Sequence, residues 1–362
     1  MIAAHPRPTV LHVTEAYGGG TMNVIHDYAA ATPELRHVVL AALRDGEDTG
    51  VVPPPDVVVT RLPRPAVAAL RALRRTVSEL EPDIVHAHSS RAGGLVRLTP
   101  GLSRARIVYT PHCFAFERQD LGPAARAVLR GAEALLARRT ALLVGVSPRE
   151  VALGRALGRR APGVYVPNVA ARPEPAAEAG PTPVEPSHTA VTVGRIGAQK
   201  DPSFFAEVAR ATARTPGPPV RFVWYGDGDP AGVRSLRAAG VEVTGWLPRA
   251  EVLRRTARAG AYLHTARWES APLTVLEAAA VGLPLVLRRS PALAGLGLPG
   301  LIDTPPQAAA RLRSLLPAVP DPGAHAALLA GHTPARQRAA LLEAYSRVSP
   351  RIAAHRPTTA AP

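Results

Sequence analysis

Residues 190–212 read AVTVGRIGAQKDPSFFAEVARAT. The β-branched run Ala190–Val193 predicts a strand, and the stretch Ser203–Thr212 predicts a helix. The loop between them carries Arg195 and Lys200. A strand, a loop and a helix make half of a βαβ unit, and the same alternation continues towards both ends of the chain.

This alternation predicts an α/β fold, because strands that are apolar on both faces and separated by helices are typical of parallel sheets. Strands are predicted at Thr9–Val13, His37–Leu40, Val57–Thr60, Ile84–His86, Ile107–Tyr109, Leu142–Val146, Val164–Val166, Ala190–Val193, Arg221–Trp224, Val241–Thr244, Ala261–His264 and Leu285–Leu287. Helices are predicted after Thr21 and at Ala66–Leu80, Ala124–Arg138, Pro148–Leu157, Ser203–Thr212, Arg249–Ala259, Pro272–Val281 and Pro334–Arg347.

The pattern is interrupted at Arg172–His188, which is dense in Pro, Ala and Glu and predicts a linker. The predicted organisation is a first α/β domain (1–170), a linker (171–188), a second α/β domain (189–335), and a C-terminal helix and tail (336–362). Ligands of open α/β sheets bind beyond the carboxyl ends of the strands. We therefore expect two domains that face each other across a cleft, with functional residues in the loops that follow strands.

The composition of the 362-residue chain excludes several classes of protein. Hydrophobic residues make up 46%, which is enough to fill large cores and excludes a mostly disordered chain. The single cysteine, Cys113, excludes a disulfide framework and multi-cysteine metal sites. No apolar run reaches the roughly 18 residues of a membrane span, and the N-terminus does not resemble a signal peptide. We therefore expect a cytoplasmic protein.

The formal net charge is +15, which favours polyanionic partners such as nucleic acid, anionic membrane or phosphorylated substrates. Lys200 is the sole lysine, so the excess is almost entirely arginine in a chain biased to Ala, Pro and Arg. Composition bias and a functional basic surface both explain such an excess. Aromatic residues total only 4%, which argues against base stacking, so we expect no nucleic-acid partner.

Two loops of the second domain carry groups suited to a phosphorylated ligand. Arg195 and Lys200 follow a predicted strand, and such cations bind phosphate oxygens as a fork and a point charge, respectively. The block WESAPLTVLE (268–277) places Glu269 in a loop and Glu277 beyond the first turn of a helix that starts near Pro272. Asp227-Gly228-Asp229 looks like a metal-binding motif, but we interpret it as a turn after a strand.

Loops of the first predicted domain carry glycines and histidines. Gly18–Gly20 precede a helix, where backbone amides can approach an anion, although a plain tight turn explains them equally well. His86 and His88 are two residues apart on a strand and point the same way, but no third metal ligand is evident. His112 follows the next strand, in a turn braced by a proline, and is placed either for a cleft or for a hydrogen-bonded core.

The strings HAHSSRAG, YTPH, VGRI with QKDP, and the E-x7-E block occur in this order from about Val10 to Val286. Together they resemble the retaining, nucleotide-sugar-dependent glycosyltransferases of family 4. The resemblance implies a GT-B fold, that is, two Rossmann-like parallel-sheet domains facing across a cleft with a C-terminal helix. It also implies retention of the anomeric configuration, through attack on the face that the diphosphate leaves, and no metal or other cofactor for the chemistry.

The resemblance also implies residue roles. Arg195 and Lys200 would hold the donor diphosphate and Glu277 the nucleotide ribose, and His112 would contact the donor sugar near the reacting carbon. The donor sugar would be held by Glu269, Ser270, Ala271, Pro272 and Leu273, the diphosphate and acceptor would lie near Gly19 and Gly20, and the acceptor-side candidates are His88, Ser89 and Arg91. His112, Arg195, Lys200 and Glu269 would be catalytic. Where the family commonly has His-Gly and Glu-Gly, this chain has His112-Cys113 and Glu269-Ser270.

The first two strings are most similar to members that build extracellular polysaccharide or lipid-linked glycans. They imply a UDP-sugar donor, a polyprenyl-diphosphate-linked glycan as acceptor, and docking of the basic first domain on an anionic inner membrane leaflet. The alternatives are a soluble small-molecule acceptor, a sugar-nucleotide epimerase or inverting transferase of the same fold, a glycoside hydrolase using Glu269 and Glu277, and a non-enzymatic binding protein.

Overall fold

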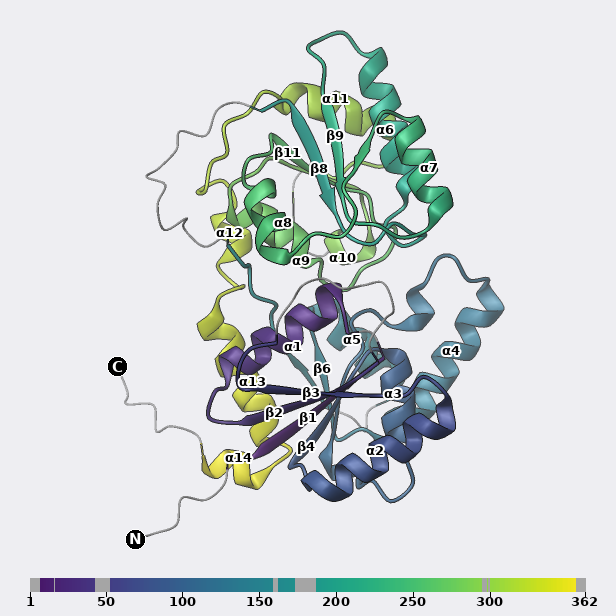
Figure 1. Cartoon of the computed structure of the whole chain (residues 1–362), viewed down its shortest axis with the longest axis vertical. Helices are drawn as coiled ribbons and strands as arrows, with labels where there is room; N and C mark the ends of the chain where they lie inside the picture. The colour runs from purple at the N-terminus through teal and green to yellow at the C-terminus, as the bar shows by residue number, and fades with distance from the viewer. Residues whose placement is uncertain are drawn as a thin grey trace. The chain divides into compact units, whose positions relative to one another are not determined.

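The computed structural model describes residues 7–15, 17–42, 53–158, 162–172, 187–294, 298 and 300–355 (Figure 1). The described chain divides into two compact units. Unit 1 holds residues 7–168 and 333–355, and unit 2 holds residues 169–332. Most of the predicted linker (173–186) and the tail after His355 lie outside the described residues.

Unit 1 is built on a sheet with the strand order β3-β2-β1-β4-β5-β6-β7, and its named strands pair in parallel. Its strands are β1 (Thr9–Thr14), β2 (Arg36–Ala41), β3 (Val57–Arg61), β4 (Ile84–His88), β5 (Ile107–Thr110), β6 (Leu142–Gly145) and β7 (Gly163–Tyr165). Its helices are α1 (Gly19–Ala31), α2 (Ala66–Leu80), α3 (Ser90–Leu98), α4 (Pro123–Leu136), α5 (Pro148–Leu157), α13 (Pro334–Ser346) and α14 (Pro350–Ala354). The strand order reverses between β1 and β4, which makes this the switch point where ligands of such sheets bind.

Unit 2 repeats the design with the order β10-β9-β8-β11-β12, again with parallel pairs between named strands. Its strands are β8 (Thr189–Val193), β9 (Arg221–Tyr225), β10 (Glu242–Val243), β11 (Ala261–His264) and β12 (Leu285–Leu287). Its helices are α6 (Pro202–Arg214), α7 (Pro230–Ala238), α8 (Arg249–Thr256), α9 (Leu273–Ala280), α10 (Pro291–Ala294), α11 (Pro305–Leu315) and α12 (Ala326–Leu329). Its switch point lies between β8 and β11.

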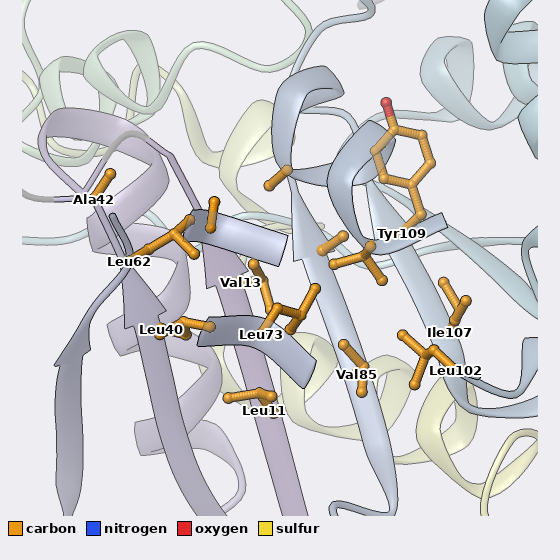
Figure 2. Packing of buried hydrophobic residues seen from close by; sticks show 14 of the residues in the cluster. Leu11, Val13, Leu40, Ala42, Leu62, Leu73, Val85, Leu102, Ile107 and Tyr109 are labelled. Carbon is orange, nitrogen blue, oxygen red and sulfur yellow. The ribbon is translucent and has the colours of Figure 1, made fainter. Parts of the chain in front are cut away.

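The central strands β1, β4, β5 and β6 of unit 1 are buried on both faces, as their sequences predict, whereas the edge strand β3 is largely exposed. On one face, Leu11, Val13 and Val85 pack with Leu73 of α2 and Ile107 of β5 (Figure 2). Side chains of a strand alternate between the two faces of the sheet. The residues between these apolar positions therefore face the other side, which α1 and α13 cover (Figure 1). Four of the residues on that side are histidines: His12, His37, His86 and His88.

The structure confirms the α/β fold with parallel sheets and places each predicted strand within a residue or two of its expected bounds. The helices α3, α7, α10, α11, α12 and α14 were not predicted. No helix among the described residues is both long and apolar enough to cross a lipid bilayer.

Candidate active site

The switch point of unit 2 brings two loops into one hydrogen-bonded structure. One loop follows β8 and the other follows β11. The N–H of Arg267 donates to the carbonyl of Gln199 over 2.9 Å, and the side-chain amide of Gln199 donates to the carbonyl of Trp268 over 3.1 Å. The hydroxyl of Thr265 donates to the carbonyl of Lys200 over 2.5 Å. The positions of Lys200 and Glu269 are therefore fixed relative to each other.

Lys200 and Glu269 form an ion pair at this point, with Nζ and Oε1 separated by 2.6 Å. Their side chains are only 17% and 13% exposed, so water screens the pair weakly. Burial acts to lower the pKa of Lys200, but the nearby carboxylates of Glu269 and Glu277 and the Tyr262 phenol outweigh it and raise the pKa. Lys200 is therefore positively charged at neutral pH.

Glu277 lies on the second turn of α9 and forms a different ion pair. Its Oε1 accepts a hydrogen bond from Nη2 of Arg249 on α8 over 3.0 Å, and its side chain is 8% exposed. Burial raises the pKa of Glu277, while Arg249 and Lys200 act against this rise. Glu269 and Glu277 are thus held by separate cations, an arrangement better suited to ligand binding than to the paired carboxyls of a hydrolase.

The remaining donor-side candidates surround this cluster. Arg195 lies in the same loop as Lys200 but is exposed, with its guanidinium 5.5 Å from the ring centroid of Trp246. Ser270 is buried, and its hydroxyl has no hydrogen-bond partner among the described residues. Ala271, Pro272 and Leu273 lead into the N-terminus of α9, where the first backbone amides of a helix point outward.

Asp227-Gly228-Asp229 is a turn, as predicted. The N–H of Gly228 donates to the side chain of Asp227 over 2.8 Å, and Asp229 caps the N-terminus of α7 by accepting from the N–H of Gly232 over 2.9 Å. Both carboxylates therefore have structural partners.

The switch point of unit 1 contains a carboxylate that the sequence did not single out. Glu15 follows β1 and accepts hydrogen bonds from the hydroxyl of Ser89 and from the N–H of Ala92 at 3.1 Å. Ser89 is thereby committed to the start of α3, whereas Arg91 on its first turn is exposed. Gly19 and Gly20 begin α1 close by in sequence and are exposed, with Gly19 in the left-handed region at φ 55°.

Four histidines of unit 1 form a continuous hydrogen-bonded chain, which we call the histidine relay. His37 Nδ1 lies 3.0 Å from His12 Nε2, His12 Nδ1 lies 2.9 Å from His88 Nε2, and His88 Nδ1 lies 2.9 Å from His112 Nε2. The first three rings are buried, and His112 at the end of the relay is partly exposed. Burial lowers the pKa of each of them, to about 3 for His112.

His12 supplies the third neighbour that His86 and His88 lacked in the sequence, since ligand atoms of the three lie within 4.8 Å of one another. Such a group could hold a metal ion. However, His86 bonds to Tyr345 and Thr110 through its two ring nitrogens, and both nitrogens of His12 and of His88 belong to the relay. We therefore interpret the group as a hydrogen-bonded network.

His112 occupies a strained turn that a buried carboxylate supports. His112 and Cys113 both have left-handed backbone conformations, with φ of 51° and 89°, which explains why a glycine is common at the second position in the resembled family. The N–H groups of Cys113 and Val146 donate to Glu150 over 2.7 and 2.9 Å. Glu150 thus fixes the turn that presents His112.

Two parallel α/β units, each with its polar loops at a switch point, are the arrangement of the GT-B fold. Residues 19–169 match the family model described as a glycosyl transferase 4-like domain, and residues 187–316 match that of glycosyl transferases group 1. The two matches together span well over half of the chain. The chain therefore belongs to the group 1, or family 4, glycosyltransferases and is a nucleotide-sugar-dependent glycosyltransferase, as its motifs predicted.

Solved structures agree with this fold. Sucrose-phosphate synthase from Thermosynechococcus elongatus is 17% identical and matches 96% of this chain and 94% of its own, with a TM-score of 0.65. Anabaena HepE in complex with UDP and glucose is 14% identical and matches 96% and 98%, also at 0.65. WaaG, a glycosyltransferase involved in lipopolysaccharide biosynthesis, is 17% identical and matches 94% and 99% at 0.63. A search of curated proteins found no significant match.

Proposed function

We propose that this protein is a retaining glycosyltransferase that binds a UDP-sugar in unit 2 and transfers the sugar to a lipid-linked glycan bound by unit 1. The observation that carries the proposal is the cluster of Lys200, Glu269, Glu277 and Arg249 at the switch point of unit 2. Lys200 suits a diphosphate, and the carboxylates of Glu277 and Glu269 suit hydroxyl groups of ribose and sugar, respectively.

Lys200 and Arg195 are proposed to bind the diphosphate. Lys200 is charged and largely buried, so it can stabilise the negative charge that develops as the nucleotide diphosphate leaves. Exposed Arg195 can reorient from Trp246 towards the phosphates. The N-terminus of α9 favours the same charge, because outward-facing amides and the helix dipole attract anions. Stabilisation of this leaving group is the main catalytic contribution in the proposal.

Glu277 and Glu269 are proposed to bind hydroxyl groups. Arg249 holds Glu277 on α9, where its carboxylate can accept from the two ribose hydroxyls. Glu269 lies beside Lys200, and we assign it the donor sugar together with Ser270, whose buried hydroxyl has no partner among the described residues. The choice of uracil as base is supported by HepE, which was solved with UDP and with UDP-glucose.

The acceptor proposal rests on the loops of unit 1. His112, Gly19, Gly20 and Arg91 are accessible at the carboxyl ends of its strands. His88 cannot touch an acceptor directly, because its side chain is fully buried and both ring nitrogens are hydrogen-bonded. The expectation that His88 contacts the acceptor is therefore wrong, and we assign His88 instead the role of holding His112 through their hydrogen bond.

Nucleotide binding tests the donor proposal. In the presence of EDTA, UDP and UDP-sugars are expected to stabilise the protein against heat, by about 2.7 kcal/mol at 100 times the dissociation constant, whereas GDP and ADP are not. Product stereochemistry by NMR then tests retention. Stabilisation by GDP or ADP instead of UDP contradicts the choice of base, and an inverted product contradicts the retaining mechanism.

A lipid-linked acceptor requires access to a membrane, and α4 has an exposed apolar face that fits this need. Val128 and Leu135 on it are 72% and 63% exposed, with Arg130 and Arg138 exposed nearby. Apolar side chains flanked by arginines favour binding to anionic lipid surfaces.

Flotation with anionic liposomes at low salt tests this docking. The wild-type protein is expected to float, and the Val128→Asp/Leu135→Asp variant to remain in solution, because each aspartate adds charge repulsion and removes apolar area. Val67→Asp on α2, where the side chain is 62% exposed, is the matched control and should float. Docking through α4 is wrong if all three proteins behave alike.

A further inference from the structure

The histidine relay has a fixed direction, which follows from the group at its inner end. A neutral imidazole has one N–H donor and one nitrogen acceptor, so each ring in a chain donates at one nitrogen and accepts at the other. The protonation of one ring nitrogen therefore determines that of every other nitrogen along the relay. All four rings are neutral at pH 7, because burial lowers the pKa of each.

Thr32 decides the direction. Nε2 of His37 lies 3.1 Å from the carbonyl oxygen of Thr32 and 3.1 Å from its hydroxyl oxygen. The carbonyl can only accept, and the hydroxyl already donates its proton to the carbonyl of Tyr28 over 2.8 Å. Nε2 of His37 must therefore carry a hydrogen.

The remaining protons follow in order. Nδ1 of His37 is an acceptor, so Nε2 of His12 donates to it. Nδ1 of His12 then accepts from Nε2 of His88, and Nδ1 of His88 accepts from Nε2 of His112. At the partly exposed end, Nδ1 of His112 is left with a lone pair and with no partner among the described residues.

We propose that the histidine relay locks His112 in its Nε2–H tautomer, so that unit 1 presents Nδ1 as a hydrogen-bond acceptor for a hydroxyl of the substrate sugar. This inference rests on the proposed function, because it takes the nucleotide sugar as the ligand. His37, His12 and His88 are positioning residues that act through His112. The backbone turn held by Glu150 sets where the ring lies, and the relay sets which of its nitrogens carries the proton.

Reversal of the relay changes Nδ1 of His112 from a hydrogen-bond acceptor to a donor. If an apolar ring replaces His37, Nε2–H of His12 faces no acceptor, and a buried N–H without a partner is among the least tolerated groups in proteins. His12 avoids this by moving its proton to Nδ1, which forces His88 and then His112 to do the same. Nδ1 of His112 then presents an N–H to the sugar. The sugar hydroxyl can accept a hydrogen bond from this group but can no longer donate one to it.

Nitrogen-15 NMR of histidine-labelled wild-type protein tests the tautomer without any catalysis. With His112→Gln used only to assign the signal, Nδ1 of His112 is expected at the shift of an unprotonated nitrogen and Nε2 at that of an N–H. The opposite pattern, or a mixture of the two, overturns the fixed direction of the relay.

Calorimetric titration of two variants with UDP and with UDP-glucose tests the consequence. His37→Phe is expected to show the reversed tautomer and to bind UDP-glucose about fivefold more weakly, the loss expected for one neutral hydrogen bond, with UDP affinity unchanged. His37→Gln keeps an N–H for Thr32 and an oxygen for His12, so it should behave as wild type. A His37→Phe protein with the wild-type ratio of the two affinities overturns the contact with the sugar.

The two proposals can fail separately. Wild-type protein that binds neither UDP nor UDP-glucose contradicts the proposed function and the sugar contact together, while the NMR pattern alone still decides the direction of the relay. Equal loss of UDP and UDP-glucose binding in both His37 variants indicates a general structural role, which also overturns the positioning role.

Discussion

Turnover is expected to fall by a factor of about 10²–10³ when Lys200 is replaced by alanine, the loss typical for removal of one preorganised group that stabilises transition-state charge. Lys200 is the only lysine of the chain, and it lies largely buried beside Glu269, with a distance of 2.6 Å between their charged atoms. In Lys200→Ala the diphosphate loses a cation and also meets a carboxylate that is no longer neutralised. UDP-dependent thermal stabilisation should be lost with it.

A double variant separates the loss of the cation from the effect of the unpaired carboxylate. Lys200→Ala leaves the largely buried Glu269 without its cation, which should lower the thermal stability of the ligand-free protein. Adding Glu269→Gln removes this unpaired charge, so it should restore that stability but not turnover. Arg221→Ala is the matched control, since it breaks an exposed ion pair with Glu242 in the same unit, whose side chains are 66% and 43% exposed. Lys200→Ala protein that keeps more than half of wild-type turnover would show that the cation has no role in the reaction.

The donor side could be predicted because its signals are local. Lys200 stands out as the sole lysine, and Glu269 lies just before a helix that a proline helps to start. Parallel strands then bring the two loops to one edge of the sheet, which general rules for α/β folds anticipate. The bonds of Gln199 to the loop of Trp268 could not be predicted, because they depend on how two separate loops pack.

The histidine relay and the contacts of Glu15 were not predicted, because both join segments that are far apart in the sequence. His12, His37 and His88 are brought together by the strand order β2-β1-β4 and by the register of these strands, neither of which a single sequence shows. The side chains of the three histidines all point to the same face of the sheet. The strand order and register would therefore have been enough to predict that they are neighbours. The helix α3 was missed because Gly93 and Gly94 lie within it, and glycine is a poor helix former.

Acid is expected to unfold unit 1 at a higher pH than unit 2. In unit 1, burial lowers the pKa of the four relay histidines, and the same cause lowers that of His86. In unit 2, His264 has a pKa lowered in this way, by burial and by Lys200. An unfolded histidine has a pKa of about 6.5, so each of these groups binds a proton more readily in the unfolded chain.

The sign of the effect follows from this difference. Between the lowered folded pKa and about 6.5, the unfolded state holds more protons, so stability is fully present above 6.5 and falls as the pH falls. Each histidine with a lowered pKa contributes a slope of up to about 1.4 kcal/mol per pH unit, so the stability of unit 1, with five such groups, should fall more steeply with acid than that of unit 2. Because whole domains are stable by only about 5–15 kcal/mol, unit 1 should be the first of the two to unfold below pH 6.5.

The distribution of tryptophans allows the unfolding of the two units to be followed separately. Trp224, Trp246 and Trp268 are the three tryptophans of the chain, and all belong to unit 2. Loss of circular dichroism should therefore begin at a higher pH than the change in tryptophan fluorescence. His37→Gln removes one buried histidine and should reduce the pH slope by about one proton, whereas His355→Gln, at an exposed position, should leave it unchanged. Unfolding coupled to the uptake of one proton or fewer would mean that the relay histidines are already charged in the folded protein, and the fixed direction of the relay would fail with it.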